Sequence, residues 1–347
     1  MRRILVITVL FLLLSVSSLE ARTGIDDKPT PAHRLDGIII HSHPPIRNPE
    51  DLRKALSKTH YLVRSGGEIQ LGRKEDEVIG HIRHRFDSRS LAVSVEGEFG
   101  QGRPGKNPAV QMEMPGPQKY SLMRTLFTLM DRYDIPLSQV ERHTDYNRDT
   151  SCPGLNFPYF QLLYDMSKQM LRDRGNPLLE DICRDRGISV PIENARLVVE
   201  KSRRRLDLYA GKILLKSYRI GLSRNSAGDK ERRGDRKTPV GTFRICEKYP
   251  MRAWMEITYP TPAHAKKGLE KGIISRKEHD EAVDAWNRGG IPRHNTALGY
   301  DIGFHAGGFA YGKMPDQFTA GCIGLEDPEA FEVFRHVPIG AVVIIRE

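Results

Sequence analysis

The first half of the chain alternates short apolar runs with amphipathic helical patterns. Isoleucine, leucine and valine runs bounded by polar residues predict buried strands at 37–40, 61–63 and 91–95. Apolar residues spaced three and four apart predict helices with one apolar side at 122–133 and 160–173. Glycine and proline between residues 100 and 116 predict a loop. This alternation predicts an α/β domain over 35–186, with a central sheet flanked by helices.

The pattern changes beyond residue 186. Charged or glycine-containing turns separate apolar, β-rich segments at 196–200, 205–209 and 212–218. We therefore predict a mostly β second domain over 195–347 and a linker at 187–194.

The N-terminus has the features of a processing signal. Two arginines follow Met1, and residues 4–14 are apolar except for Thr8. A helix of that length is too short to cross roughly 30 Å of hydrocarbon, and small residues suited to signal peptidase follow it. We expect residues 1–21 to be a cleaved signal peptide and 22–34 a polar tether, with a retained membrane anchor as the alternative. A secreted protein of the bacterial periplasm or cell wall is expected, free of the membrane after cleavage.

Composition narrows the class of protein. The 347 residues are 39% hydrophobic and 28% charged, which suits a soluble globular chain and argues against a disordered or membrane-embedded one. The formal net charge of +10 favours a polyanionic partner. Arginine clusters occur without interleaved aromatic residues, so we expect no nucleic acid. No phosphate-cradling or dinucleotide motif is present, so we expect no organic cofactor.

One group of residues in the first half suits a metal. His41 ends the first predicted strand, and His143 stands nine residues before Cys152, which Pro153 and Gly154 follow. Two imidazoles and one thiolate suit catalytic zinc, which keeps a fourth position open.

These residues resemble the zinc-dependent N-acetylmuramoyl-L-alanine amidase and peptidoglycan recognition protein family over about residues 35–165. In that family an apolar strand ends in His, and a His-x-Asp segment runs into Cys-Pro-Gly. The resemblance implies that zinc is bound by His41, His143 and Cys152. It also implies that Thr150 steadies the tetrahedral intermediate beside the metal and that His81 lines the substrate groove.

The acid/base residue of this family is missing from its usual places. Family members that cleave carry a Tyr before the hairpin or a Glu in the later strand, where this chain has Thr59 and Ser94. Proton transfer to the leaving amine still needs such a group. The substitutes that the sequence leaves open are Tyr61, Glu96, His43 and His60. The alternative is a wall-binding module that does not cleave.

The second half contains a candidate thiol nucleophile. Cys322 follows Gly321 directly and lies seventeen residues after His305. Glycine before a nucleophile permits a tight turn whose N–H groups converge on an oxyanion, and a nearby imidazole is expected to lower the pKa of the thiol.

Residues 195–347 resemble the L,D-transpeptidase catalytic domain (YkuD-like), including the segments 236–245 and 254–260. The resemblance implies a β-sandwich-like fold with Cys322 as nucleophile and His305 as base. It also implies that the carbonyl of Ala306 orients the imidazole, that the Gly321 and Cys322 amides form the oxyanion hole, and that Gly307 contributes to substrate binding. Three positions depart from the commonest pattern, namely Ala306 for Gly, Ala320 for His and Gly324 for Arg or Asn. The change at Gly324 bears on binding of a substrate carboxylate.

Cys183 and Cys246 stand in no motif. They fit either a disulfide that ties the linker region to the second domain or two unpaired buried thiols.

Both resemblances point to one polymer. We predict an exported peptidoglycan-remodelling enzyme whose second domain acts on stem peptides as an L,D-transpeptidase through a Cys thioester. The first domain is expected to cleave the muramic acid–alanine linkage or only to bind peptidoglycan. The alternatives are an L,D-carboxypeptidase, with water as acceptor, and a non-catalytic cell-wall-binding protein; the oligomeric state stays open.

Overall fold

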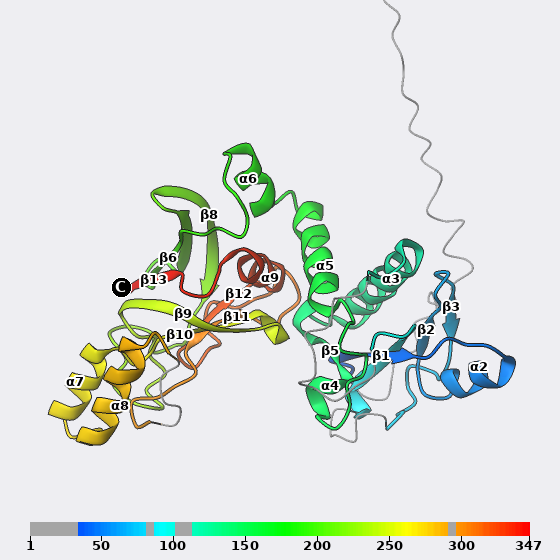
Figure 1. Cartoon of the computed structure of the whole chain (residues 1–347), viewed down its shortest axis with the longest axis horizontal. Helices are drawn as coiled ribbons and strands as arrows, with labels where there is room; N and C mark the ends of the chain where they lie inside the picture. The colour runs from blue at the N-terminus through cyan, green and yellow to red at the C-terminus, as the bar shows by residue number, and fades with distance from the viewer. Residues whose placement is uncertain (1–33, 81–86, 101–112, 291–295) are drawn as a thin grey trace, which may run out of the picture.

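The computed structural model describes residues 34–80, 87–100, 113–290 and 296–347, which form two lobes side by side (Figure 1). The predicted signal peptide (1–21), nearly all of the tether and His81 lie outside the described residues.

A five-stranded sheet with the order β3-β2-β4-β1-β5 is the centre of the N-terminal lobe. Strand β1 (Gly37–His43), between β4 and β5, runs parallel to both of its neighbours. A hairpin of β2 and β3 forms one edge. The other strands are β2 (Tyr61–Val63), β3 (Ile69–Leu71), β4 (Ser90–Glu96) and β5 (Val140–Arg142). The helices are α2 (Pro49–Leu56), α3 (Gly116–Tyr133), α4 (His143–Tyr146) and α5 (Tyr159–Asp173). Two short 3-10 turns are η1 (Asp87–Arg89) and η2 (Leu137–Gln139). The predicted α/β fold is confirmed.

Burial explains why β1 and β4 show no alternation of polar and apolar residues. Ile38, Ile39 and Ile40 are buried, as is every residue of β4. Parallel strands covered on both faces read as continuous apolar runs. The helical segments instead bury one side, for example Leu122, Leu126 and Leu129 of α3.

The C-terminal lobe is a closed eight-stranded barrel with the order β10-β11-β12-β8-β7-β6-β13-β9. Its strands are β6 (Ala195–Glu200), β7 (Arg205–Ala210), β8 (Ile213–Gly221), β9 (Gly241–Tyr249), β10 (Trp254–Ile257), β11 (Gly303–Ala306), β12 (Ile323–Leu325) and β13 (Val342–Arg346), with the 3-10 turn η3 (Met251–Ala253) before β10. The mostly β domain is confirmed, and its strands close into a barrel. The last strand, β13, pairs with β6 on one side and β9 on the other and so closes the sheet.

Four helices accompany the barrel: α6 (Leu179–Asp185), α7 (Pro262–Glu270), α8 (Arg276–Asn287) and α9 (Asp327–His336). In Figure 1, α7 and α8 lie at the end of the barrel far from the N-terminal lobe, where they enclose a small apolar core of their own. The predicted linker, 187–194, falls between α6 and β6 and contains neither helix nor strand. The domain boundaries themselves stay a prediction.

Helices α5 and α9 join the two lobes (Figure 1). The ring of Phe160 on α5 lies 4.8 Å from that of Phe334 on α9, and Ser167 Oγ donates to the carbonyl oxygen of Pro328 at 2.9 Å. The buried apolar side chains of both lobes form one continuous cluster. The lobes therefore share a core.

All four cysteines have free thiols. Cys183 is buried in α6, and Cys246 donates to the carbonyl oxygen of Glu256 in the barrel. The unpaired alternative therefore holds in this structure.

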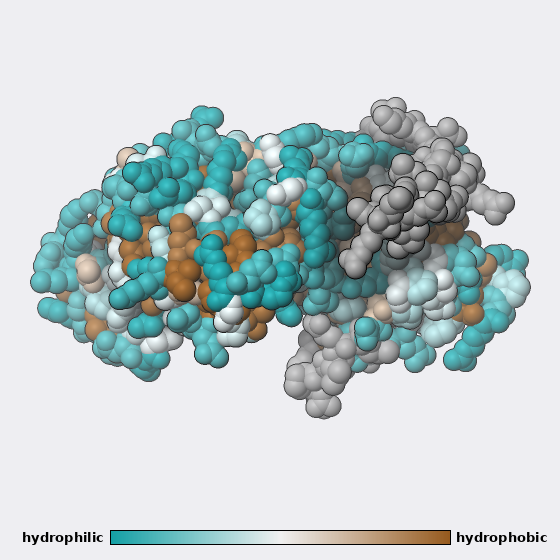
Figure 2. Space-filling view, turned by 90° about the horizontal axis from the view of Figure 1, so that it is seen from above, coloured by the Kyte–Doolittle hydropathy of each residue, from teal (hydrophilic) through white to brown (hydrophobic). Residues whose placement is uncertain are grey.

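Hydrophilic residues cover most of the surface in Figure 2, with apolar residues showing mainly on the barrel. Within the described part of the chain, no helix combines the length and the apolar character needed to cross a membrane.

Candidate active sites

The structure brings His41, His143 and Cys152 together. His41 lies on β1, His143 is the first residue of α4, and Cys152 follows in the next loop. One ligand atom from each lies within 4.8 Å of the other two. The Sγ of Cys152 is 3.6 Å from Nδ1 of His41. Two ligands of one zinc ion lie about 3.6 Å apart at its usual bond lengths and a tetrahedral angle, so this group fits zinc in both chemistry and spacing.

Backbone and hydroxyl groups fix Cys152 in this group. The N–H of Ser42 donates to the sulfur at 3.4 Å, and the Cys152 N–H donates to Thr150 Oγ at 3.1 Å. Burial raises the pKa of the Cys152 thiol, and the hydrogen bond from Ser42 partly opposes this shift. Thr150 therefore contacts the backbone of Cys152, one of the three candidate ligands.

Thr59 and two of the four candidate acid/base residues are committed to other contacts. The hydroxyl of Thr59 is buried against the carbonyl oxygens of Tyr61 and Ala92 at 2.8 and 3.0 Å. The Tyr61 hydroxyl donates to Glu75. Both ring nitrogens of His60 are used, Nδ1 by the N–H of Ala92 and Nε2 by the carbonyl of Glu77. These side chains hold the sheet edge together.

Glu96 is held as an ionised carboxylate, so it is not available as a proton donor. It accepts from the N–H groups of Ile46 and Ser65 and forms an ion pair with Arg64 at 2.6 Å. Burial raises the pKa of Glu96, but Arg64 and the two backbone donors outweigh it and hold the pKa below its usual value.

His43 is the remaining candidate. It stands two positions beyond His41 on β1, so the two side chains share one face of the sheet. Ser94 lies directly beside His41 in the register of β1 and β4. His43 is partly exposed, and one ring nitrogen contacts the carbonyl of Pro44 at 2.9 Å, which leaves the other for a substrate.

Strand pairing brings the segments that carry His305 and Cys322 side by side. β11 and β12 run parallel, and His305 pairs with Gly324. Cys322 stands two positions before Gly324, in the bend that leads into β12. Both residues are partly exposed.

The imidazole of His305 is oriented as the resemblance implies. Its Nδ1 is 2.8 Å from the carbonyl oxygen of Ala306. A carbonyl only accepts, so Nδ1 holds the proton and Nε2 is left as the base. Trp254 stacks on the ring at 6.1 Å between centroids, and Phe318 meets it edge-on at 6.2 Å.

The expected lowering of the thiol pKa is not found. Burial, with the nearby carboxylates of Asp301 and Glu256, raises the pKa of Cys322 to about 11. The thiol donates to the carbonyl oxygen of Asp301 at 3.3 Å. Burial also lowers the pKa of His305, and the positive charge of Arg252 adds to that shift. Both groups are therefore uncharged near neutral pH.

Neighbouring atoms explain why glycine occupies several positions around the nucleophile. Gly321 has a φ of +134°, and a Cβ there would lie 3.0 Å from the carbonyl oxygen of Lys237. The N–H of Gly307 donates to the carbonyl oxygen of Leu325 at 2.7 Å, so this amide serves the fold. At Gly324 a Cβ would lie 2.1 Å from the ring of Phe318. The aromatic ring fills the space that the Arg or Asn of the commonest pattern would need.

A cationic pocket of about 450 Å³ borders Cys322, and the sequence analysis did not foresee it. Lys230, Arg233 and Arg236 line it, with Asp301 as the acidic residue. The sequence contains one sign of this pocket, the basic cluster at 232–233, which lies just before the segment 236–245. Lys230 is paired with Asp235 at 2.8 Å, so Arg233 and Arg236 are the cations that offer a place for a substrate carboxylate next to the sulfur.

Comparisons with known protein families agree with this division. Residues 194–345 match the family model of the L,D-transpeptidase catalytic domain (YkuD), and residues 31–155 match that of N-acetylmuramoyl-L-alanine amidase. The chain joins a domain of each family. The two matches support a peptidoglycan-remodelling enzyme.

Solved structures resemble one half of the chain or the other. An N-acetylmuramoyl-L-alanine amidase endolysin, LysCS from Clostridium intestinale, is 24% identical and covers 39% of this chain and 90% of its own, with a TM-score of 0.30. The amidase AmiD from E. coli, bound to an anhydro-muramyl peptide substrate, is 19% identical over 40% of this chain and 60% of its own, with a TM-score of 0.33. The helical cell shape determining protein Pgp2 from Campylobacter jejuni is 20% identical over 44% of this chain and 47% of its own, with a TM-score of 0.30. Among curated proteins, none matches the chain.

Proposed function

We propose that the protein is an exported L,D-transpeptidase that works through a thioester on Cys322. The observation that carries this proposal is the pairing of β11 with β12, which brings the segments of His305 and Cys322 side by side, with Nδ1 of the imidazole held by the Ala306 carbonyl. That arrangement leaves Nε2 to take the proton of the thiol, as a base does in an activated nucleophile pair.

The chemistry follows from the two uncharged groups. Nε2 of His305 removes the thiol proton as Sγ attacks the carbonyl carbon between an L-centre and a D-residue. The N–H groups of Gly321 and Cys322 stabilise the oxyanion. The C–N bond then breaks, the departing amine takes the proton from His305, and the acyl group stays on sulfur. An amine from a second stem peptide attacks the thioester, passes its proton to His305 and releases the thiol. Water in place of that amine makes the enzyme an L,D-carboxypeptidase.

The amidase domain is proposed to hydrolyse the amide between muramic acid and L-alanine. Zinc held by His41, His143 and Cys152 would supply Lewis-acid activation of the amide and of water. His43, on the same face as His41, is proposed to pass a proton to the leaving amine. Thr150 is proposed to steady the tetrahedral intermediate.

Intact sacculi with products resolved by mass spectrometry test both activities. Cys322→Ala is expected to abolish changes at stem-peptide termini and cross-links. His143→Ala is expected to abolish only the separation of stems from glycan. His43→Ala should slow that separation while zinc content stays unchanged. If the wild type releases no stems, the amidase domain is a binding module. If Cys322→Ala leaves the cross-links changing as before, the transpeptidase proposal is wrong, and a non-catalytic wall-binding protein becomes the better account.

Export belongs to the same proposal. An apolar run over residues 4–14, after two arginines, supports cleavage near Ala21 and a place in the periplasm or cell wall. The mature N-terminus, read by sequencing the protein recovered from its bacterium, checks this: an intact Met1 would contradict it.

A further inference from the structure

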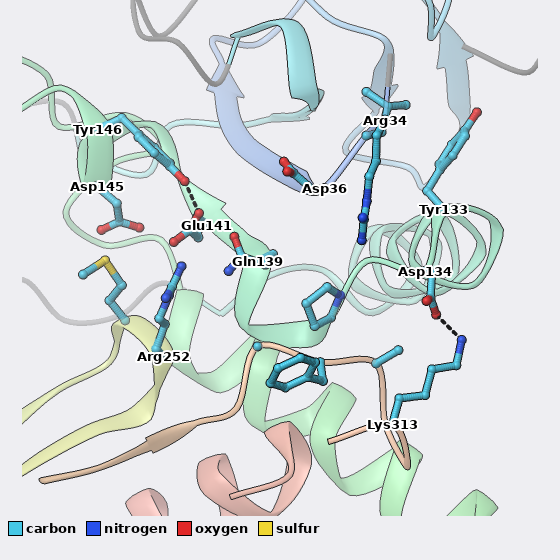
Figure 3. Close-up of a pocket in the computed structure, with 16 residues that line it drawn as sticks. Arg34, Asp36, Tyr133, Asp134, Gln139, Glu141, Asp145, Tyr146, Arg252 and Lys313 are labelled. Atoms are coloured by element: carbon cyan, nitrogen blue, oxygen red, sulfur yellow. Dashed lines mark hydrogen bonds and ion pairs between the residues drawn. The ribbon is translucent and has the colours of Figure 1, made fainter. Parts of the chain in front are cut away.

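The loop that follows the base His305 meets the amidase domain. A cavity of about 680 Å³ lies where the two domains come together (Figure 3). Gly308, Phe309 and Lys313 of this loop line it from one side, and Asp134 lines it from the amidase domain. Lys313 reaches across and forms an ion pair with Asp134 at 2.7 Å (Figure 3). The segment that leaves the base therefore contacts a domain of the other family.

Asp327 makes the buried contact between this loop and the amidase domain. It is the first residue of α9 and is 1% exposed. One carboxylate oxygen accepts from the N–H of Gly308 at 2.9 Å, and the other accepts from the N–H of Ser138 at 2.7 Å. Burial raises the pKa of Asp327 to about 6, so the carboxylate is mostly ionised at neutral pH and accepts both bonds. One side chain therefore ties η2 of the amidase domain to the third residue after the base.

A second contact holds the same loop at Tyr311. Arg174, at the end of α5, donates to the carbonyl oxygen of Tyr311 at 2.9 Å, and its guanidinium lies 4.7 Å from the centre of the Tyr311 ring. Asn176 donates to the Tyr311 hydroxyl at 2.6 Å. The N-terminal lobe therefore holds the loop at two points, one buried and one at the surface.

Aromatic packing connects this loop to the imidazole of His305. Phe309 meets the ring of Phe318 edge-on at 5.1 Å, and Phe318 meets the His305 ring edge-on at 6.2 Å. The carbonyl of Ala306, which orients Nδ1 of His305, lies two residues before Gly308. A movement of the loop at Gly308 therefore disturbs both the ring that packs on the base and the carbonyl that orients it.

We propose that Asp327 is a positioning residue for the transpeptidase reaction, through which the amidase domain holds the loop behind His305. This inference rests on the proposed transpeptidase function. Both oxygens of Asp327 accept from backbone N–H groups, so its carboxylate takes no part in proton transfer. It fixes the orientation of the His305 ring, and with it the rate at which Nε2 takes the proton of Cys322. The amidase domain is then a structural part of the transpeptidase site, whether or not it cleaves peptidoglycan itself.

A double-mutant cycle with His305 tests this role. Mass spectrometry follows acylation of Cys322 by a donor tetrapeptide in full-length wild type, Asp327→Asn, His305→Ala and the double variant. Single-turnover conditions resolve the slow rate that remains without the base. Asn keeps the shape of Asp but turns an NH2 group toward one of the two N–H donors, so the bridge between the domains is broken.

Asp327→Asn should lower the maximal rate of acylation about ten- to a hundredfold, the loss expected when a base is misplaced, and leave the KM for the donor nearly unchanged. In the His305→Ala background the same substitution should change the rate by less than about twofold, because a positioning residue has no effect once the group that it positions is gone. A purely structural role would lower both rates alike.

Glu332→Gln is the matched control. Glu332 is another buried carboxylate on α9 that accepts a backbone N–H, but its bonds go to α6 and β8. Its acylation rate should match the wild type. Alkylation of Cys322 by iodoacetamide should be equally fast in wild type, Asp327→Asn and Glu332→Gln, since it needs the thiol and not the base. Normal acylation in Asp327→Asn, an equal loss in Glu332→Gln, or the same loss without His305 overturns the inference.

The contact at Tyr311 keeps the inference testable if Asp327→Asn does not fold. Arg174→Gln removes an exposed side chain and should lower the maximal rate of acylation about two- to fivefold, the range for one exposed charged contact. Arg172→Gln, also exposed and on α5, is its control and should match the wild type. Equal rates in these two variants would then count against the inference.

Nuclear magnetic resonance of the imidazole separates this inference from the proposed function. If the wild type forms no acyl-enzyme, the proposed function fails, but the orientation of His305 can still be measured in protein labelled with ¹⁵N-histidine. The His305 signals are identified by their loss in His305→Ala. They should show the proton on Nδ1 in the wild type and a mixture of both tautomers in Asp327→Asn. Identical His305 signals in these two proteins refute the positioning role on their own.

Discussion

Cys322 and His305 have pKa shifts in opposite directions, and both shifts favour the uncharged form. Burial and the carboxylates of Asp301 and Glu256 raise the pKa of the thiol to about 11, against the opposing charge of Lys230. Burial lowers the pKa of the imidazole below its usual 6.5. The resting pair is therefore a thiol beside a neutral base, and the proton moves when substrate arrives.

This pair predicts how alkylation of Cys322 depends on pH. The thiolate fraction grows as pH rises toward about 11, so the rate with iodoacetamide should rise about tenfold per pH unit across the neutral range. Peptide mass spectrometry distinguishes Cys322 from the other three thiols. A resting imidazolium–thiolate pair would instead give a plateau near neutral pH that His305→Ala removes, and that profile would show the pKa direction to be wrong.

Gly321 yields a second prediction at this scale. Its φ of +134° and the 3.0 Å approach to the Lys237 carbonyl leave no room for a side chain. Gly321→Ala should shift the turn before Cys322, cutting thioester formation at least about tenfold because the oxyanion donors move.

Gly340→Ala is the matched control for backbone strain alone. Gly340 has a φ of +88° with nothing near its Cβ position. The Gly340→Ala variant should lose about 1 kcal/mol of unfolding free energy, while its rate of thioester formation stays at the wild-type value. Equal acylation rates in the two variants would contradict the steric argument.

Motifs located the chemistry of these residues but could not report their surroundings. Sequence spacing brought out His41, His143 and Cys152, and the structure places them together. The thiol pKa depends on Glu256 and Asp301, which are distant in sequence from Cys322, so no local pattern contained it. The same holds for Phe318, whose ring occupies the space over Gly324. Only folded contacts show that His43 remains available while Tyr61, Glu96 and His60 do not.

The elements themselves were predictable because their signals are local. Apolar runs gave β1, β2 and β4, and helical spacing gave α3 and α5. Closure of the barrel was not predictable, since β13 pairs with β6, 146 residues earlier (Val342 with Arg196), and side-chain periodicity does not specify a partner strand.

Glu332 connects three elements and carries a prediction at their scale. Its buried carboxylate on α9 accepts from the N–H of Leu179 at 2.6 Å, from Lys216 Nζ at 2.7 Å and from the Tyr218 hydroxyl at 3.0 Å. Glu332→Ala leaves the mostly buried Lys216 ammonium without its charged partner, so urea unfolding should show a loss of about 3–5 kcal/mol in the free energy of unfolding.

A surface carboxylate serves as the control for that loss of unfolding free energy. Glu270 forms an exposed pair with Lys266 on α7 at 3.9 Å. Glu270→Ala should change the unfolding free energy by less than about 1 kcal/mol. If both variants lose the same small amount, Glu332 does not connect α6, β8 and α9 as described.

At the scale of the whole molecule, the shared core couples the two domains. The Phe160 ring on α5 packs between Phe331 and Phe334 on α9, at centroid distances of 6.2 and 4.8 Å. Domains joined by a large apolar interface unfold together, so the wild type should give one calorimetric transition with matching calorimetric and van't Hoff enthalpies.

Phe160→Ala should divide that transition into two, because it removes a ring from the interface while each domain keeps its own sheet and helices. The loss of apolar contact is expected to weaken the interface by about 2–4 kcal/mol. Tyr120→Ala, on the outer side of α3 where the side chain is 67% exposed, should keep a single transition. Two transitions in the wild type would mean that the domains unfold independently.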